Sequence, residues 1–196
     1  MLISIDGIDG CGKSTQVGLL SERLGADRIQ EISPSRWGKL LRGSESPSLA
    51  QQLAWFTADR AVIAERLEAH AGNPDQHLVS DRSYLSGVAY QSYDSALTPS
   101  FLEEMNRSIV PEYDLQLLLD VPIETAFARI EARGEKKTWC ENPELLTHAA
   151  AVFREQAARR ENVVLVNAKQ SIEEVFADVM AAVEAASQRV YGRVVF

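Results

Sequence analysis

The segment that most constrains this chain is Gly7-Ile8-Asp9-Gly10-Cys11-Gly12-Lys13-Ser14, which matches the pattern G-x-x-x-x-G-K-[ST]. It lies directly between a short apolar run at 2–5 and a helical pattern at 14–24. Glycines let the backbone curl so that successive N–H groups face phosphate oxygens, and the following helix adds the positive end of its dipole. The segment therefore predicts a phosphate-binding loop between a buried strand and a helix.

The residue types in this loop predict a nucleoside triphosphate ligand. Lys13 is expected to bridge the β and γ phosphates of ATP, and the hydroxyl of Ser14 to bind Mg²⁺. The loop residues expected to bind ATP are Gly7, Asp9, Gly10, Cys11, Gly12, Lys13, Ser14 and Thr15. Since Cys11 lies near Lys13 and a helix N-terminus, we expect a lowered thiol pKa, unless Cys11 is simply a small residue that fits.

A second carboxylate fits the same chemistry. The apolar run 77–81 ends in Asp81, and a strand that ends this way places the carboxylate at the carboxyl edge of the sheet, beside the metal. We therefore expect Ser14 and Asp81 to hold Mg²⁺, with Asp81 also counted as catalytic. The alternative is that Asp81 only caps the helix that follows it.

Apolar runs alternate with helical periodicity along the whole chain, which predicts an α/β fold: a five-stranded parallel sheet with helices on both faces. We expect one phosphate-loop kinase domain over residues 1–196 with a short lid at about 134–142. The tail 190–196 is expected to form an extra strand or to dock in an interface. Strands are predicted at 2–5, 28–32, 77–81, 115–119 and 163–166, and helices at 14–24, 49–71, 85–93, 101–109, 123–133, 144–160 and 172–186.

Charge and composition exclude several classes of function. The 20 Lys and Arg residues against 28 Asp and Glu give a net charge of −8, which argues against a nucleic-acid surface. No apolar run reaches the roughly 20 residues of a membrane span. The N-terminus lacks the basic region of a signal peptide, so we expect a cytoplasmic protein without a membrane partner.

Among proteins with such a loop, the sequence favours a small-molecule kinase. A GTPase switch needs an N-K-x-D motif, and the nearest segment, Asn167-Ala168-Lys169-Gln170, does not match it. Arg129 and Arg133 lie one helical turn apart, just before the expected lid, where they can reach phosphates. Their alternative is to be solvated surface side chains.

Three segments resemble the thymidylate kinase family. They are Gly7–Gln16, then Phe56-Thr57-Ala58-Asp59-Arg60, similar to F-x-A-D-R, and finally 81–91, similar to D-R-Y-x-x-S-x-x-A-Y-Q. The resemblance runs from residue 1 to about 185. It implies transfer of a phosphoryl group from ATP to dTMP, with Mg²⁺, in a homodimer. A related kinase for another deoxynucleotide or a nucleoside, or a nucleotide-binding protein without transfer activity, are the alternatives.

The resemblance also implies roles for residues that match the family's motifs. Asp9 would accept a hydrogen bond from the acceptor sugar, and Phe56 would stack on the base. Arg60 would bind the base and stabilise the transferring phosphoryl group, and Arg82 would hold the acceptor phosphate. Tyr90 would lie against the sugar, beside Gly87 and Gln91 of the same motif. Arg133 would lie over the adenine and act in catalysis, beside Arg129. From the sequence alone, Phe56 and Tyr90 could equally be core residues, and Arg60 and Arg82 surface ion-pair partners.

Two segments depart from the family's pattern. Glu31-Ile32-Ser33-Pro34 stands where T-R-E-P is usual, so Ile32 takes the place of an arginine that binds the acceptor phosphate. We expect Arg36 to supply this charge instead. The lid carries Lys137-Thr138-Trp139-Cys140-Glu141 in place of D-R-x-E, and Ser83 replaces the tyrosine of D-R-Y. These departures bear on the choice of acceptor more than on the fold.

Overall fold

The computed structural model describes residues 1–93, 95–134 and 140–196. Its sheet is five-stranded and entirely parallel, in the order β2-β3-β1-β4-β5. This confirms the predicted fold class. The strands are β1 (Leu2–Asp6), β2 (Asp27–Gln30), β3 (Leu78–Asp81), β4 (Leu115–Asp120) and β5 (Val163–Asn167).

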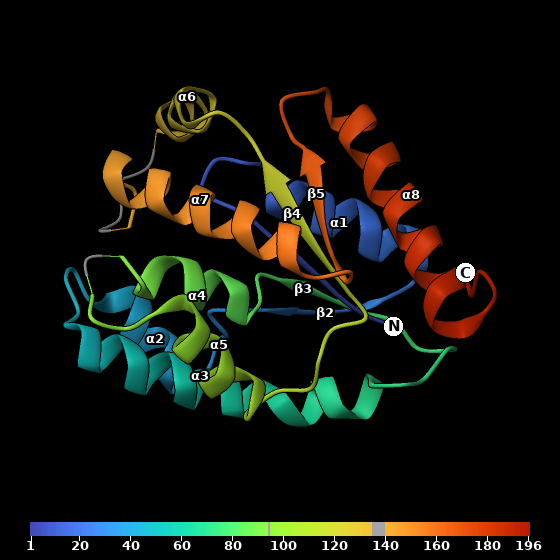
Figure 1. The fold of residues 1–196 in the computed structure, drawn as a ribbon, viewed down its shortest axis with the longest axis horizontal. Coiled ribbons are helices and arrows are strands. Elements are labelled where there is room, and N and C mark those ends of the chain that lie inside the picture. Colours follow the sequence, from blue (N-terminus) through green and yellow to red (C-terminus); the bar gives the residue numbers. More distant parts are fainter. Residues whose placement is uncertain (94, 135–139) are drawn as a thin grey trace.

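Helices cover both faces of the sheet (Figure 1). Helices α1 and α8 pack together on one side, and α3, α4, α5 and α7 lie on the other. The long helices begin where the sequence provides a cap: Ser48 and Ser171 each form a capping box with a residue three positions later. The helices are α1 (Lys13–Leu24), α2 (Arg36–Gly43), α3 (Leu49–His70), α4 (Tyr84–Gln91), α5 (Pro99–Arg107), α6 (Ile123–Arg133), α7 (Pro143–Arg159) and α8 (Ile172–Tyr191).

The core of the molecule lies around the two central strands. All five residues of β1 are buried, as are the first five of β4. Strands of a parallel sheet are covered on both faces, so they are apolar along their length rather than alternating. Burial of such runs supplies most of the free energy that holds the sheet between its helices.

The topology places the carboxyl ends of three strands at one edge. Strand β1 lies between β3 and β4, so the chain leaves β1 at the point where the order of the strands reverses. Ligands of parallel α/β sheets bind in the crevice at such a point. The phosphate loop follows β1 there, and Asp81 and Asp120 end the neighbouring strands β3 and β4.

The fold differs from the sequence prediction in three places. Helix α2 was not predicted, because it is only eight residues long and carries Gly38 and Gly43. Helix α8 continues to Tyr191, five residues beyond its predicted end. The tail after it forms no strand among the described residues, so the expected extra strand is wrong. Phe196 instead packs edge-on against the ring of His77, with the ring centroids 6.3 Å apart. Most of the predicted lid, residues 135–139, lies outside the described residues.

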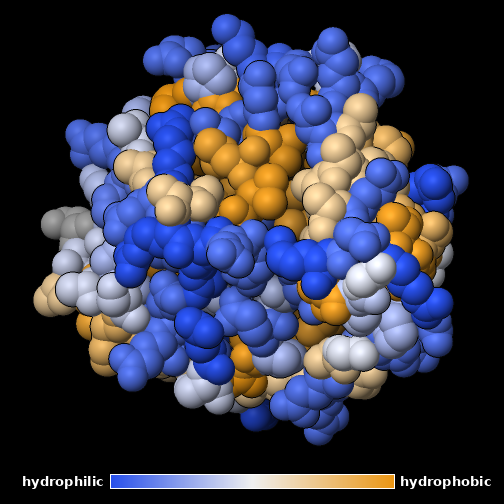
Figure 2. All heavy atoms as spheres, turned by 45° about the vertical axis from the view of Figure 1, so that its right-hand side comes forward, coloured by the Kyte–Doolittle hydropathy of each residue, from blue (hydrophilic) through white to orange (hydrophobic). Residues whose placement is uncertain are grey.

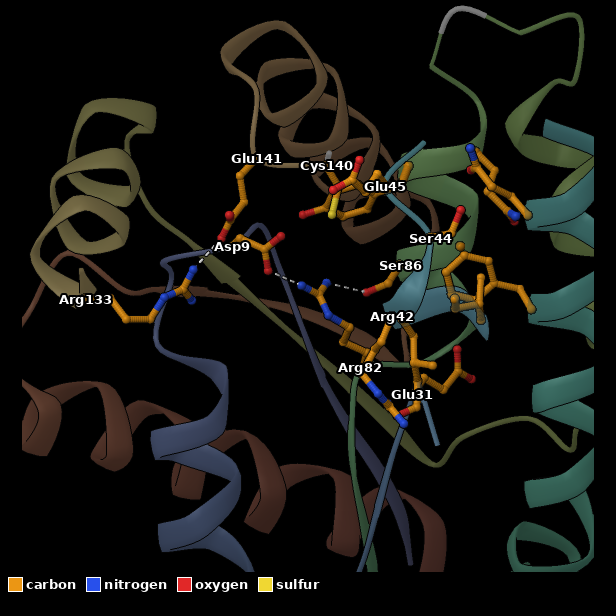
Figure 3. A pocket seen from close by; sticks show the side chains of 17 residues that line it. Asp9, Glu31, Arg42, Ser44, Glu45, Arg82, Ser86, Arg133, Cys140 and Glu141 are labelled. Atoms are coloured by element: carbon orange, nitrogen blue, oxygen red, sulfur yellow. Dashed lines mark hydrogen bonds and ion pairs between the residues drawn. The ribbon is translucent and has the colours of Figure 1, made fainter. Parts of the chain in front are cut away.

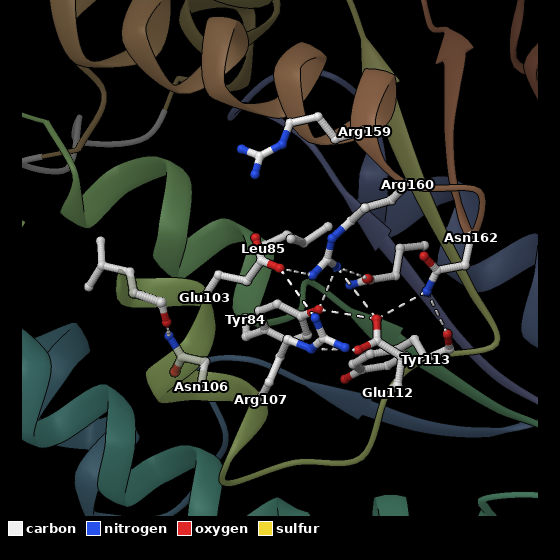
Figure 4. A network of polar contacts seen from close by, with 12 residues as sticks. Tyr84, Leu85, Glu103, Asn106, Arg107, Glu112, Tyr113, Arg159, Arg160 and Asn162 are labelled. Atoms are coloured by element: carbon white, nitrogen blue, oxygen red, sulfur yellow. Dashed lines mark hydrogen bonds and ion pairs between the residues drawn. The ribbon is translucent and has the colours of Figure 1, made fainter. Parts of the chain in front are cut away.

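Opposite the phosphate loop, a polar network ties α7 to the other helices (Figure 4). The guanidinium of Arg160 donates to the Tyr84 hydroxyl at 2.7 Å and pairs with Glu103. Burial raises the pKa of Tyr84 to about 12. Because Tyr84 is the first residue of α4, the network anchors the helix that carries Tyr90 and Gln91.

On the face that Figure 2 shows, polar side chains surround several groups of apolar ones. Leu165 of β5 and Ile172 of α8 are among the large apolar side chains that remain exposed. Among the described residues, no helix is both long enough and apolar enough to cross a membrane.

Candidate active site

The phosphate loop has the backbone conformation that its glycines allow. Gly7 and Gly10 have positive φ angles of 140° and 81°. A Cβ atom at Gly10 would lie 2.3 Å from the carbonyl oxygen of Ala126, and one at Gly7 would lie 2.6 Å from that of Leu119. Neither position tolerates a side chain, because the loop packs directly against backbone.

The side chain of Lys13 folds back across the phosphate loop. Lys13 is only 7% exposed, and its Nζ donates to the carbonyl oxygen of Ile8 at 2.9 Å. Asp9 Oδ1 lies 3.8 Å from the same Nζ. The positive charge of Lys13 is therefore held over the cradle that the sequence predicts for phosphates.

The two residues predicted to bind a metal meet at the edge of the sheet. Ser14 Oγ donates to Asp81 Oδ2 at 2.8 Å across 67 residues of sequence. Hydroxyl and carboxylate oxygens suit Mg²⁺, which is usually held by one or two protein groups together with phosphates. In keeping with this, the described residues contain no group of three or more His, Cys, Asp or Glu side chains that could hold a metal by themselves.

A cavity of about 680 Å³ opens beside the loop, between α2, α3 and α4 (Figure 3). Many of the residues predicted from the family resemblance line it. They are Asp9, Phe56, Arg82, Gly87, Tyr90, Gln91 and Arg133. Arg36 and Arg60 are not among the lining residues.

Arg82 and Asp9 form an ion pair at the inner end of the cavity. Arg82 also donates to the carbonyl oxygen of Gly7 and the hydroxyl of Ser86, each at 3.2 Å, and its guanidinium lies 5.5 Å above the Tyr90 ring. Burial alone would raise the pKa of Asp9, but the charges of Arg82 and Lys13 hold it below its usual value. Asp9 is thus a carboxylate at neutral pH and can accept a hydrogen bond from a ligand hydroxyl.

Arg60 lies behind the cavity wall. It is 1% exposed, and its Nε and Nη2 donate to the carboxylate of Glu31, with Nη2 2.7 Å from Oε2. A further N–H donates to Asn106. Burial disfavours the charge of Arg60, yet Glu31 raises its pKa above the usual value. The group that reaches the cavity from this pair is Glu31, which the sequence analysis did not identify.

Helix α2 presents a different arginine to the cavity from the one predicted. The guanidinium of Arg36 stacks on the ring of Trp37, 4.3 Å from its centroid. Arg42, in the last turn of the same helix, lines the cavity instead. Its Nη1 and Nη2 donate to the carbonyl oxygens of Ile32 and Ser33, both at 2.8 Å. The sequence could have pointed to Arg42 only through the prediction of helix α2, and this helix is too short to be predicted from periodicity.

Gln91 offers hydrogen bonds to a ligand from the floor of the cavity. It is 2% exposed, and neither end of its amide has a hydrogen-bond partner among the described residues. A Cβ atom at Gly87 would lie 3.4 Å from Gln91 Oε1 and 3.0 Å from Arg60 Nη2. Buried polar groups without partners are costly, and a ligand that pairs with this amide removes the cost.

The two predicted arginines of α6 contact different parts of the site: Arg129 contacts the phosphate loop, and Arg133 lines the cavity. Arg129 donates to the carbonyl oxygen of Ala168 at 3.1 Å and, at longer range, to those of Gly10 and Cys11. It thereby links the phosphate loop to the turn between β5 and α8. Arg133 is exposed at the end of α6 and pairs with Glu141 at 2.5 Å.

The prediction of a lowered pKa for Cys11 is wrong. Cys11 is 2% exposed, and burial raises the pKa of its thiol by more than the nearby charge of Lys13 lowers it. The free-energy cost of removing a thiolate from water exceeds the stabilisation that the charge of Lys13 provides at this position. Cys11 is therefore a neutral thiol that fills space beneath Gly7.

Comparison with known proteins agrees with this geometry. The family profile described as thymidylate kinase matches residues 5–179. The chain belongs to the thymidylate kinase family. It is 34% identical to a probable thymidylate kinase of Archaeoglobus fulgidus over 94% of this chain and 95% of that one. It is 30% identical to the thymidylate kinase of Akkermansia muciniphila, over 92% and 95% of the two chains.

Solved thymidylate kinases share the fold. The structure from Candida albicans superposes with a TM-score of 0.76 at 22% identity, covering 94% of this chain and 91% of that chain. The structure from Ehrlichia chaffeensis gives 0.72 at 20% identity. The family match and the relatives at 30% and 34% identity make the chain a nucleoside monophosphate kinase that phosphorylates dTMP with ATP.

Proposed function

We propose that dTMP binds in the cavity between α2, α3 and α4, and that its phosphate receives the γ-phosphoryl group of an ATP held by the phosphate loop, leaving ADP. The observation that carries the proposal is the position of this cavity. Its lining includes the Asp9–Arg82 ion pair beside the loop, and Phe56 and Gln91, which lie near Arg60 behind the wall. The ion pair suits a phosphate and sugar, and Phe56 and Gln91 suit a flat base with hydrogen-bonding edges.

On the acceptor side, Arg42 and Arg82 hold the phosphate. Arg42 takes the role expected of Arg36, because Arg42 lines the cavity and Arg36 does not. Phe56 stacks on the thymine, and the unpaired amide of Gln91 hydrogen-bonds its edge. Arg60 acts from behind the wall, through Glu31, rather than on the transferring group itself.

On the donor side, Lys13 turns from the Ile8 carbonyl to the β and γ phosphates once ATP fills the loop. Ser14 and Asp81 would hold a magnesium ion, which would offset negative charge on the donor phosphates. Arg133 comes over the donor, and Arg129 keeps the loop in place. The acceptor phosphate is already ionised at neutral pH, so the site needs no strong general base and works by positioning and electrostatic stabilisation.

A substrate panel tests the proposal. Purified protein with ATP and Mg²⁺ is offered dTMP, dUMP, dCMP, dAMP, dGMP and thymidine, and ADP release is measured. We expect the highest kcat/KM with dTMP and none with thymidine. A preference for thymidine or for a purine nucleotide would overturn the proposed acceptor.

Two variants of α2 separate the roles of its arginines. Arg42→Ala is expected to raise the KM for dTMP roughly 10- to 150-fold, the equivalent of one charge-assisted hydrogen bond, and to leave the KM for ATP nearly unchanged. Arg36→Ala is the matched control and should change neither KM. If Arg36→Ala raises the KM for dTMP and Arg42→Ala does not, Arg36 is the residue that binds the acceptor phosphate.

We further propose the homodimer implied by the family resemblance, and the cytoplasmic location and single-domain organisation expected from the sequence. The exposed apolar side chains of Val62 and Phe101 are consistent with a covered face on α3 or α5. Light scattering after size-exclusion chromatography gives the molar mass. A mass near that of one chain at micromolar concentration would refute the dimer.

A further inference from the structure

We infer that Asp59 is a positioning residue for the acceptor phosphate. It holds the segment Ser33–Ser35, and that segment holds the guanidinium of Arg42 at the cavity. The inference rests on the role proposed above for Arg42. Asp59 belongs to the motif that contains Phe56 and Arg60. None of the contacts proposed above for the thymine base or for ATP involves it.

The carboxylate of Asp59 is buried and fully engaged by this segment. It is 2% exposed and accepts from the backbone N–H of Ser33 at 2.7 Å. The hydroxyls of Ser33 and Ser35 both donate to Oδ1, each at 2.5 Å. Three donors on one buried carboxylate join α3 to the segment, and hydrogen bonds to a charged acceptor are roughly twice as strong as neutral ones.

The other side of the same segment holds Arg42. The carbonyl oxygens of Ile32 and Ser33 accept from the two terminal nitrogens of the guanidinium, both at 2.8 Å. Ser33 therefore gives its N–H and hydroxyl to Asp59 while its carbonyl receives Arg42. A shift of this residue moves the side chain of Arg42 directly.

The position of helix α2 depends on the same segment. The hydroxyl of Ser35, which donates to Asp59, also accepts from the N–H groups of Trp37 and Gly38 and so caps α2. A Cβ atom at Gly38 would lie 2.0 Å from the carbonyl oxygen of Ser33, so the helix packs directly against the segment. Asp59 thus fixes both the helix that carries Arg42 and the carbonyls that orient its guanidinium.

The dependence on the acceptor's phosphate is what distinguishes this role from general support of the fold. We expect Asp59→Ala to weaken dTMP binding at least 10-fold, measured as Kd by calorimetry, while the Kd for thymidine and the KM for ATP change less than two-fold. Asp59→Asn is expected to recover part of the loss. Its amide oxygen can accept from the Ser33 N–H and its NH₂ group can donate to the Ser33 hydroxyl, but the Ser35 hydroxyl already accepts from two N–H groups of α2 and loses its acceptor. Combined with Arg42→Ala, the Asp59→Ala change should add little, because both act on one contact.

Ser33→Ala is the second variant, for use if Asp59→Ala does not fold. It removes one hydroxyl and leaves the backbone contacts, so we expect a smaller loss that is again confined to dTMP. Equal weakening of dTMP and thymidine, full additivity with Arg42→Ala, or unchanged dTMP binding in the variants that fold would overturn the inference. If Arg42→Ala itself binds dTMP as tightly as the parent protein, the proposed role of Arg42 fails, and the inference fails with it.

Discussion

Replacing Glu31 by Gln removes one charge from the most deeply buried ion pair of the molecule's described part. Arg60 and Glu31 have side chains that are only 1% and 5% exposed. Glu31 raises the pKa of Arg60 even though burial opposes the charge, so this carboxylate supplies the charge that compensates the guanidinium in the protein interior. In Glu31→Gln the shape is kept and the compensating charge is lost.

The burial of the pair decides the size of the effect. Removing one partner of a buried pair costs about 3–5 kcal/mol, because a charge is left uncompensated. Asn106 and the new amide oxygen still accept from Arg60, so we expect the lower end, about 3 kcal/mol. For a chain of this size that lowers Tm by roughly 6–12 °C.

Urea unfolding of the protein without nucleotides measures the free energy of unfolding. The midpoint should fall with an unchanged m-value. The control is Glu155→Gln, whose partner Arg159 lies one turn away on α7, with side chains 55% and 50% exposed. An exposed pair of this kind is worth about 0.3–0.5 kcal/mol. If Glu31→Gln costs no more than this control, the reasoning from burial is refuted.

Three further predictions test the site. Lys13→Ala should keep its Tm and lower kcat by about 100- to 1,000-fold, whereas a variant with half the activity would refute the phosphate-loop assignment. Because burial raises the pKa of Cys11, iodoacetamide at pH 7 should modify Cys140 first, which mass spectrometry of the parent protein checks, and the rate at Cys11 should increase with pH, which the Cys140→Ser variant checks. Tyr90→Ala should narrow the preference for dTMP over its ribonucleotide by about 1–3 kcal/mol in kcat/KM, and an equal fall with both substrates would show that the sugar is selected elsewhere.

The features that the sequence alone determined depend either on a few consecutive residues or on the periodicity of apolar residues. The phosphate loop is eight consecutive residues whose glycines permit the positive φ angles that this loop conformation requires, so the motif predicts its own structure. The alternation of apolar strands with helices is a property of periodicity, and it predicted the parallel sheet and nearly every helix. The meeting of Ser14 and Asp81 followed from the same logic, since the carboxyl ends of parallel strands share one edge.

Only the tertiary structure decided which charged side chains reach the cavity. Arg36 and Arg42 lie six residues apart, about 240° around a helix, and nothing local says which direction of α2 faces the ligand. From the sequence, Arg60 was expected to contact the ligand. In the structure it instead pairs in the interior with Glu31, which lies 29 residues away in the chain. Cys11 looked reactive because Lys13 is near in sequence, but its pKa depends on how much water the whole fold removes. Burial and ion pairing are sums over neighbours distant in the chain, and a sequence read in windows does not contain them.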